Sequence, residues 1–241
     1  MVTGAGQGIG RAVALRYAAE GAKVAVVDLN AATSESVARE IDDAGGTAIA
    51  VACDVGNREE VFAAARRAGA ELGPISILVS NAGVTRPALL WKMTDEQWDT
   101  VLRVHLTGSF YWLQAVSAQM RENRHGNIIF TTSDAGIVGT VGQINYAAAK
   151  AGLLGMTRAA ARELAPYDIV VNAVAPSAAT AMTETIRTDP RFKDKYLDEF
   201  LLKRWAEPEE IASVYAFLAS SEANFLTGQT FAPGGGRVMV R

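Results

Sequence analysis

Short apolar segments alternate with longer helix-like segments along almost the whole chain, and this alternation restricts the possible fold most. The apolar segments are rich in β-branched residues, which is typical of parallel strands covered on both faces. They comprise residues 23–28, 47–53, 75–81, 127–132, 169–175 and 229–232. The helical segments comprise residues 10–20, 33–44, 58–72, 94–121, 145–164 and 208–218. The pattern predicts an α/β fold, a Rossmann-type doubly wound parallel sheet flanked by helices.

The length of the chain favours one domain. A chain of 241 residues, 49% of them hydrophobic, can bury a large single core, and no repeat or linker divides it. We therefore expect a single domain over residues 1–241. Only Met1 and Val2 precede Thr3, whereas the first strand of a Rossmann sheet is central and several residues long. The first strand is therefore expected to be truncated or very short.

Composition excludes several classes of function. The net charge of −3 gives no reason to expect nucleic acid or an anionic membrane as partner. Cys53 is the single cysteine, so no internal disulfide forms, and no cluster of residues predicts a metal site. The first residues lack the pattern of a signal peptide, and no apolar stretch is long enough to span a bilayer. These features predict a cytoplasmic setting.

Residues 3–10 read Thr-Gly-Ala-Gly-Gln-Gly-Ile-Gly and join the first strand to the first helix. Glycines let the backbone turn tightly and approach a pyrophosphate, whose charge the N-terminus of the following helix stabilises. A strand–helix turn without a ligand could use the same residues. The loop by itself therefore leaves a dinucleotide site and a plain turn both open.

Asp28 ends the second strand, where a carboxylate can accept hydrogen bonds from the ribose hydroxyls of adenosine. The same charge repels the 2′-phosphate of NADP. Its neighbours Leu29 and Asn30 are uncharged, as is Gln7 in the glycine loop. The structural alternative for Asp28 is a helix N-cap. We predict NAD as the cofactor, with NADP disfavoured.

Tyr146 and Lys150 are four residues apart in a predicted helix, so their side chains share one face. An ammonium beside a phenol favours the phenolate, which predicts a lowered pKa for Tyr146 and a role as acid or base. Ser133 follows the 127–132 strand, 13 residues before Tyr146. An exposed helix pair and a turn-forming serine are the alternatives. What favours chemistry is that polar residues follow several successive strands, at the edge where such sheets bind ligands.

These motifs together resemble the classical short-chain dehydrogenase/reductase family, from Thr3 to the glycines at 234–236. The resemblance rests on residues 3–10, Asp28, residues 53–55, residues 80–83, the set of Ser133, Tyr146 and Lys150, and the loop at Pro176. It implies that Tyr146 exchanges the substrate proton, Ser133 orients the substrate oxygen, and Lys150 tunes Tyr146 and binds the nicotinamide ribose. Hydride then passes between the carbinol carbon and the nicotinamide.

The resemblance also implies a set of cofactor-binding residues. They are Gly4, Gln7, Gly8, Ile9, Asp28, Leu29, Asp54, Val55, Asn81, Ala82, Gly83, Val104, Tyr146, Lys150, Pro176 and Ser177. The chain departs from the family in two places. His105 stands where relatives carry an asparagine of a catalytic proton relay. It preserves the relay if the backbone carbonyl is what matters, lowers activity if the side-chain amide is needed, or is an inert helix residue. Ser177 replaces the usual glycine after Pro176, which weakens the expected contacts to the nicotinamide carboxamide.

Residues 177–205 correspond to the family's substrate-binding lid. Some of its apolar residues must border the pocket, although most of them suit helix packing. They are Met182, Ile186, Phe192, Tyr196, Phe200, Leu201, Leu202 and Trp205. Position alone suggests four further pocket residues, namely Val84, Trp91, Ala135 and Gln143.

The expected function is an NAD-dependent oxidoreductase that interconverts a secondary alcohol and its ketone, with a polyol, sugar or hydroxyacyl group as substrate. The alternative within the family is a 3-oxoacyl thioester reductase. Such reductases generally prefer NADPH, which Asp28 disfavours, but basic residues of the lid suit a carrier-linked substrate. A catalytically silent dinucleotide-binding protein is the alternative from another class. The family also implies a homo-oligomer, a tetramer or dimer.

Overall fold

Seven parallel strands form one sheet in the computed structural model, which describes residues 1–240. The strands are β1 (Val2–Thr3), β2 (Lys23–Asp28), β3 (Thr47–Ala52), β4 (Ile77–Ser80), β5 (Gly126–Thr131), β6 (Ile169–Val174) and β7 (Thr230–Phe231). Their order in the sheet is β3-β2-β1-β4-β5-β6-β7. The chain winds outward from β1 to β3 and then crosses to β4 on the other side of β1. The predicted Rossmann-type α/β fold is confirmed.

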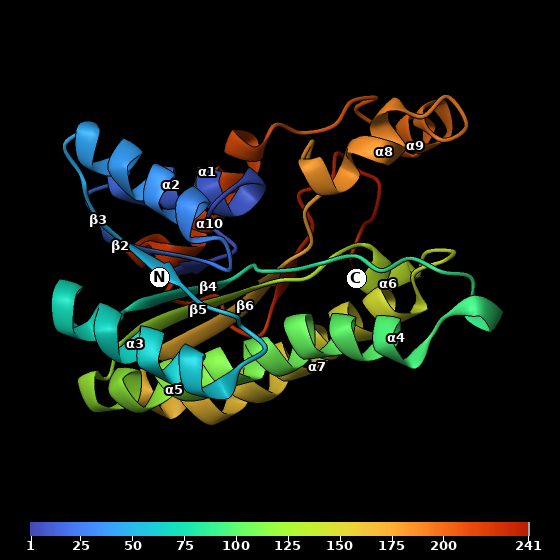
Figure 1. The fold of residues 1–241 in the computed structure, drawn as a ribbon. Helices are drawn as coiled ribbons and strands as arrows, with labels where there is room; N and C mark the ends of the chain where they lie inside the picture. Colours follow the sequence, from blue (N-terminus) through green and yellow to red (C-terminus); the bar gives the residue numbers. More distant parts are fainter. Residues whose placement is uncertain (241) are drawn as a thin grey trace.

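Helices cover both faces of the sheet (Figure 1). One layer holds α1 (Gly8–Ala19), α2 (Ala31–Asp43) and α10 (Pro208–Ala219), and the other holds α3 (Arg58–Leu72), α5 (Gly108–Asn123) and α7 (Ile144–Leu164). Alternate residues of β2 enter two separate cores, Val26 packing under the first layer and Val27 under the second. Because both faces are buried, the strands are apolar almost throughout.

β1 is the short strand that the sequence predicts. Val2 pairs with Val26 of β2 on one side and with Val79 of β4 on the other. Met1 extends this contact, since its carbonyl accepts a hydrogen bond from the Val79 amide at 2.9 Å. β1 therefore joins the two halves of the sheet through very few residues.

The predicted helix over residues 94–121 is interrupted in the structure. It consists of α4 (Asp95–Leu102), a π-helical segment η2 (Arg103–Thr107) and α5. The π-helical segment contains His105, which is buried, and its carbonyl accepts a hydrogen bond from the Ser109 hydroxyl at 2.6 Å. The sequence shows only continuous helical character here, because no residue type marks a single π-helical turn inside an α-helix.

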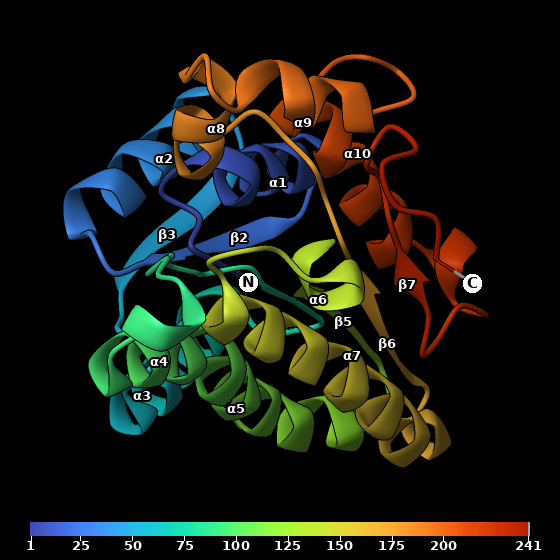
Figure 2. The same ribbon diagram turned by 90° about the vertical axis from the view of Figure 1, so that its right-hand side faces the viewer.

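The lid, residues 177–205, lies beyond the carboxyl ends of the strands. It contains α8 (Glu184–Thr188) and α9 (Lys193–Glu199), which stand apart from the two helix layers at one end of the sheet (Figures 1 and 2). A further short helix, α6 (Ala135–Val138), follows β5 at the same end. Within residues 1–240, no helix is long and apolar enough to cross a membrane.

Candidate active site

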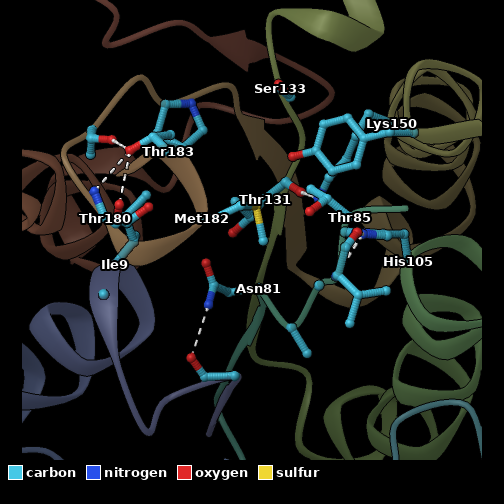
Figure 3. Close-up of a pocket in the computed structure, with 18 of the residues that line it drawn as sticks. Ile9, Asn81, Thr85, His105, Thr131, Ser133, Lys150, Thr180, Met182 and Thr183 are labelled. Atoms are coloured by element: carbon cyan, nitrogen blue, oxygen red, sulfur yellow. Dashed lines mark hydrogen bonds between the residues drawn. The ribbon is translucent and has the colours of Figure 1, made fainter. Parts of the chain in front are cut away.

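A cavity of about 640 Å³ lies at the carboxyl ends of the strands, and every residue predicted to be catalytic or cofactor-binding lines it. These residues are Gly4, Gln7, Gly8, Ile9, Asp28, Leu29, Asp54, Val55, Asn81, Ala82, Gly83, Val104, His105, Ser133, Tyr146, Lys150, Pro176 and Ser177. Figure 3 shows the two sides of the cavity, with Ile9, Thr180 and Thr183 on one side and Thr131, His105 and Lys150 on the other.

The glycine loop, residues 3–10, forms a tight turn at the start of α1 that borders the cavity, and we call this turn the glycine cradle. Gly4 and Gly8 have φ values of 62° and 55°, a conformation that side chains disfavour. A Cβ atom on Gly10 would lie 2.1 Å from the Gly4 carbonyl oxygen. No side chain caps the N-terminus of α1, whose N-cap residue is Gln7. The amides of this helix end therefore face the cavity and suit the pyrophosphate of a dinucleotide.

Thr3 and Asn81 hold the glycine loop against β4. The Asn81 side-chain amide donates to the carbonyls of Thr3 and Gly4 at 3.1 and 3.2 Å. The Thr3 hydroxyl accepts hydrogen bonds from the backbone amides of Asn81 and Ala82 at 2.9 and 3.1 Å. Asn81 therefore shapes the cradle through contacts within the protein. Thr3 shares this role, which its sequence position alone does not reveal.

Asp28 faces the glycine loop. Its carboxylate accepts hydrogen bonds from the Gly6 amide at 2.9 Å and from the Asn30 amide at 3.0 Å. The N-cap of α2 is Asn30, whose side chain accepts from the amides of Ala32 and Thr33. The N-cap alternative for Asp28 is therefore wrong.

Asp54 lines the same side of the cavity and is paired with Arg103. The Asp54 carboxylate accepts from the Gly56 amide at 2.8 Å and from the Arg103 guanidinium at 2.9 Å. Burial raises the pKa of Asp54, but these hydrogen bonds and the Arg103 charge outweigh burial and lower the pKa below its usual value. Asp54 is thus a fixed anion at the rim, and its neighbour Val55 lines the cavity.

Lys150 is buried and bonded to the end of β5. Its ammonium nitrogen lies 2.5 Å from the Thr131 carbonyl oxygen, and the Lys150 carbonyl accepts from the Thr132 hydroxyl at 2.8 Å. The same nitrogen lies 5.5 Å from the centre of the Tyr146 ring. Burial lowers the pKa of Lys150 to about 7. Thr131 was not predicted as a site residue, because its contribution is a backbone carbonyl.

The predicted direction of the Tyr146 pKa is wrong. Burial raises this pKa to about 12, the Ser133 hydroxyl opposes that rise, and the Asp134 charge adds to it. The sequence gives the proximity of Lys150 correctly but not the cost of removing the phenolate from water. Tyr146 is consequently a protonated phenol near neutral pH.

His105 packs edge-on against Tyr146, with ring centres 5.1 Å apart and planes at 88°. Its Nε2 atom lies 2.8 Å from the Val84 carbonyl oxygen and 3.0 Å from the Val84 amide nitrogen. Nδ1 is buried and has no hydrogen-bond partner among the described residues. Burial and the Lys150 charge lower the pKa of His105 well below its ordinary value, so the ring is neutral.

The loop after Pro176 reaches over the glycine loop. Thr180 Cγ2 would lie 3.4 Å from a Cβ atom on Gly8. The Thr183 hydroxyl donates to the carbonyls of Ala178 and Thr180 and accepts from the Thr180 amide. Ser177 is buried, and its amide donates to the Pro233 carbonyl at 3.4 Å. The lid therefore begins directly above the cradle.

Some of the residues suggested as pocket residues line the cavity, and others lie outside it. Four of the apolar lid residues line the cavity, namely Met182, Ile186, Tyr196 and Trp205, as do Val84, Ala135 and Gln143 outside the lid. Trp91 is 77% exposed and lies outside the cavity, so that prediction is wrong. Asp134 and Arg237 also line the cavity and were not predicted, because no local motif marks them.

Known proteins similar to this chain act on acyl groups. A family profile described as enoyl-(acyl carrier protein) reductase matches residues 4–237. The chain is 43% identical to the 3-oxoacyl-(acyl carrier protein) reductase FabG of Staphylococcus epidermidis, over 99% of this chain and 98% of that relative. It is 44% identical to the 3-oxoacyl-(acyl carrier protein) reductase of Synechocystis, over 99% and 96%. FabG of Thermotoga maritima is 40% identical, over 99% and 97%.

Proposed function

The chain belongs to the short-chain dehydrogenase/reductase family, and on that premise we propose that it is an NAD(H)-dependent reductase of 3-oxoacyl thioesters. The observation that carries this proposal is the meeting of Ser133, Tyr146 and Lys150 on the cavity that also contains the glycine cradle. A nicotinamide cofactor supplies or accepts the hydride when bound. The protein residues supply the binding, the orientation and the proton.

The protonated state of Tyr146 suits the proton transfer that reduction of a carbonyl requires. A pKa of about 12 keeps the phenol protonated near neutral pH, ready to give a proton to the oxygen of a carbonyl under reduction. Ser133 is buried beside it and is placed to orient that oxygen.

Lys150 is suited to hold the phenol and a ribose together. Its bond to Thr131 fixes the ammonium nitrogen under the Tyr146 ring, and hydroxyls of a ribose can complete its hydrogen bonds. The neutral His105 ring packs against the same phenol and restricts its position. The proton passed to the substrate leaves Tyr146 Oη, and Lys150, beside the Tyr146 ring, is a basic group from which it can be restored.

Asp28 supports NAD(H) over NADP(H). Its carboxylate lies at the cradle, and the basic residues that line the described cavity bind elsewhere, Lys150 to Thr131 and Arg237 to Asp134. A 2′-phosphate would thus meet an anion without a compensating cation. This charge pattern supports the cofactor prediction independently of the relatives.

The substrate class comes from the relatives. All three named above are 3-oxoacyl-(acyl carrier protein) reductases matched over nearly their whole length. They favour the thioester alternative over the polyol and sugar alcohols that the sequence first suggests. The complete set of Ser133, Tyr146 and Lys150 on one cavity also argues against a silent dinucleotide-binding protein.

A substrate panel tests the proposal. Purified protein is assayed with NADH and with NADPH against acetoacetyl-CoA, an enoyl thioester, a ketose and a simple ketone. We expect NADH oxidation with acetoacetyl-CoA and little with the others. Turnover confined to the enoyl thioester or to the ketose would refute the substrate assignment. NADH binding without turnover of any compound would instead support the silent alternative.

We also propose that the protein is a homo-oligomer, as the family implies. Large apolar side chains remain exposed on the described surface, among them Phe110 of α5, Ile144 of α7 and Phe225 before β7. Light scattering coupled to gel filtration measures the mass directly, and a monomer at micromolar concentration would contradict the prediction.

A further inference from the structure

Arg237 joins the lid to the loop that carries Ser133. Its guanidinium forms one ion pair with Asp134, the residue after Ser133, and a second with Glu199 of α9 at 2.8 Å. The Arg237 side chain also lies over two rings of the lid, 4.9 Å from the centre of Tyr196 and 5.6 Å from that of Phe200. One side chain near the C-terminus thus contacts two segments that are far apart in sequence.

The Arg237–Asp134 contact is largely shielded from water, whereas Glu199 is 41% exposed. The side chains of Arg237 and Asp134 are 15% and 14% exposed, whereas the other ion pairs of the lid are much more open. A buried arginine left without a carboxylate is strongly unfavourable, so Arg237 needs a carboxylate partner, and Asp134 is the more buried of its two. Backbone bonds fix the same segment, since the Leu202 amide donates to the Gly235 carbonyl at 3.2 Å. The C-terminal segment and the lid are therefore held as a unit.

Asp134 links this ion pair to the reaction centre. Its Oδ1 atom accepts a hydrogen bond from the Ser133 hydroxyl at 2.8 Å, while Oδ2 contacts Arg237. The Ser133 hydroxyl has one proton to donate, and a substrate carbonyl needs that same proton. A carboxylate without a countercharge is the stronger competitor for it. The charge on Arg237 therefore decides how readily Ser133 turns toward a substrate.

We propose that Asp134, Arg237 and Glu199 form a charge clasp that closes the lid and frees the Ser133 hydroxyl for the substrate oxygen. Arg237 is then a positioning residue that acts through Asp134. This inference rests on the proposed reductase function for its kinetic part only. It also implies that Arg237, occupied by two carboxylates, is no receptor for an anionic substrate group.

Kinetics of three variants test the action on Ser133. In R237M, Asp134 loses its countercharge, so kcat for acetoacetyl-CoA should fall by on the order of ten-fold or more, while the KM for NADH changes little. D134N removes the competing carboxylate together with one ion pair of the clasp, so its kcat should fall less than that of R237M, because an amide competes weakly for the Ser133 proton. The double variant D134N/R237M should recover the part of the kcat that R237M loses through Ser133 and should approach the value of D134N. A merely structural role of Arg237 gives no such recovery, and an unrescued loss would overturn the proposal.

The matched control removes a different arginine of the lid. Arg204 pairs with Glu210 at 2.7 Å, is 56% exposed and does not line the cavity. R204M should keep the kcat of the unmodified protein. An equal loss of kcat in R204M and R237M would show that any change in the lid lowers turnover, and it would refute a specific role for Arg237.

Lid closure is measured without any turnover. Trypsin can cut α9 and its approach at Arg191, Lys193 and Lys195, which are exposed. R237M should be cut between residues 191 and 195 several-fold faster than the unmodified protein or R204M, as measured by mass spectrometry. Equal cleavage rates would refute the clasp. Because this assay needs no substrate, it remains decisive even if the protein fails to reduce 3-oxoacyl thioesters.

Discussion

At the scale of single residues, burial decides the chemical state of the site more than pairing does. Tyr146 and Lys150 lie close together, yet burial raises the pKa of the phenol to about 12 and lowers that of the amine to about 7. Each group is therefore displaced toward its neutral form. The resulting site offers a proton donor rather than a resting phenolate, as a reductase needs.

Removal of the phenolic hydroxyl tests this assignment. Tyr146→Phe keeps the ring that packs on His105 but removes the proton donor, so turnover should fall by roughly 10²–10⁴-fold. The affinity for NADH, measured by fluorescence titration, should stay nearly constant because the glycine cradle is untouched. Turnover close to that of the unmodified protein would exclude Tyr146 as the acid.

His105 predicts a pH dependence of stability. Its pKa is lowered in the folded state, so below about pH 6.5 the unfolded chain binds a proton that the folded protein does not. Stability is then lost as the pH falls, by up to about 1.4 kcal/mol per pH unit. His105→Asn removes this dependence, so the unfolding free energy in urea should fall less between pH 6.5 and 5. His125, the other histidine, is exposed, and His125→Asn should behave as the unmodified protein.

At the scale of elements, the sequence predicts the strands and helices that have a periodic apolar pattern, and it misses short irregular segments that have none. The strands and most helices follow from apolar periodicity, and the strand ends predict which polar residues meet at the cavity. The π-helical segment over Arg103–Thr107 and the short helices of the lid have no such signal. Arg237 was missed for another reason, since its partners Asp134 and Glu199 become neighbours only in the folded chain.

The glycine cradle gives a prediction at this scale. Gly10→Ala places a Cβ atom 2.1 Å from the Gly4 carbonyl oxygen, so the loop must move and NADH binding should weaken by on the order of ten-fold or more. Gly155 in α7 is the matched control, because a Cβ atom there meets nothing within 4 Å. Gly155→Ala should stabilise the protein by about 0.5–1 kcal/mol and leave NADH binding unchanged. Equal effects of the two substitutions would contradict the cradle.

At the scale of the whole molecule, the cavity joins both halves of the sheet. Asp28 ends β2 on one side of β1, whereas Lys150 of α7 bonds to the end of β5 on the other. β1 itself connects the halves through only two residues. A dinucleotide that spans the cavity would therefore contact both halves at once, and its binding energy would add to the stability of the complete fold.

Thermal unfolding with added cofactor measures this coupling. NADH at about 100 times its Kd should stabilise the fold by about 2.7 kcal/mol, which corresponds to a rise in Tm of roughly 5–10 °C for a chain of this size. NADPH at the same concentration should raise Tm much less, because its 2′-phosphate meets the Asp28 carboxylate.

Asp28→Asn removes that charge, so the two cofactors should then give similar shifts. Since Arg11 lies outside the cavity and pairs with Glu40, Arg11→Gln should keep the difference between cofactors. Equal shifts with NADH and NADPH in the unmodified protein would refute the role of Asp28, because a carboxylate at the ribose must distinguish them.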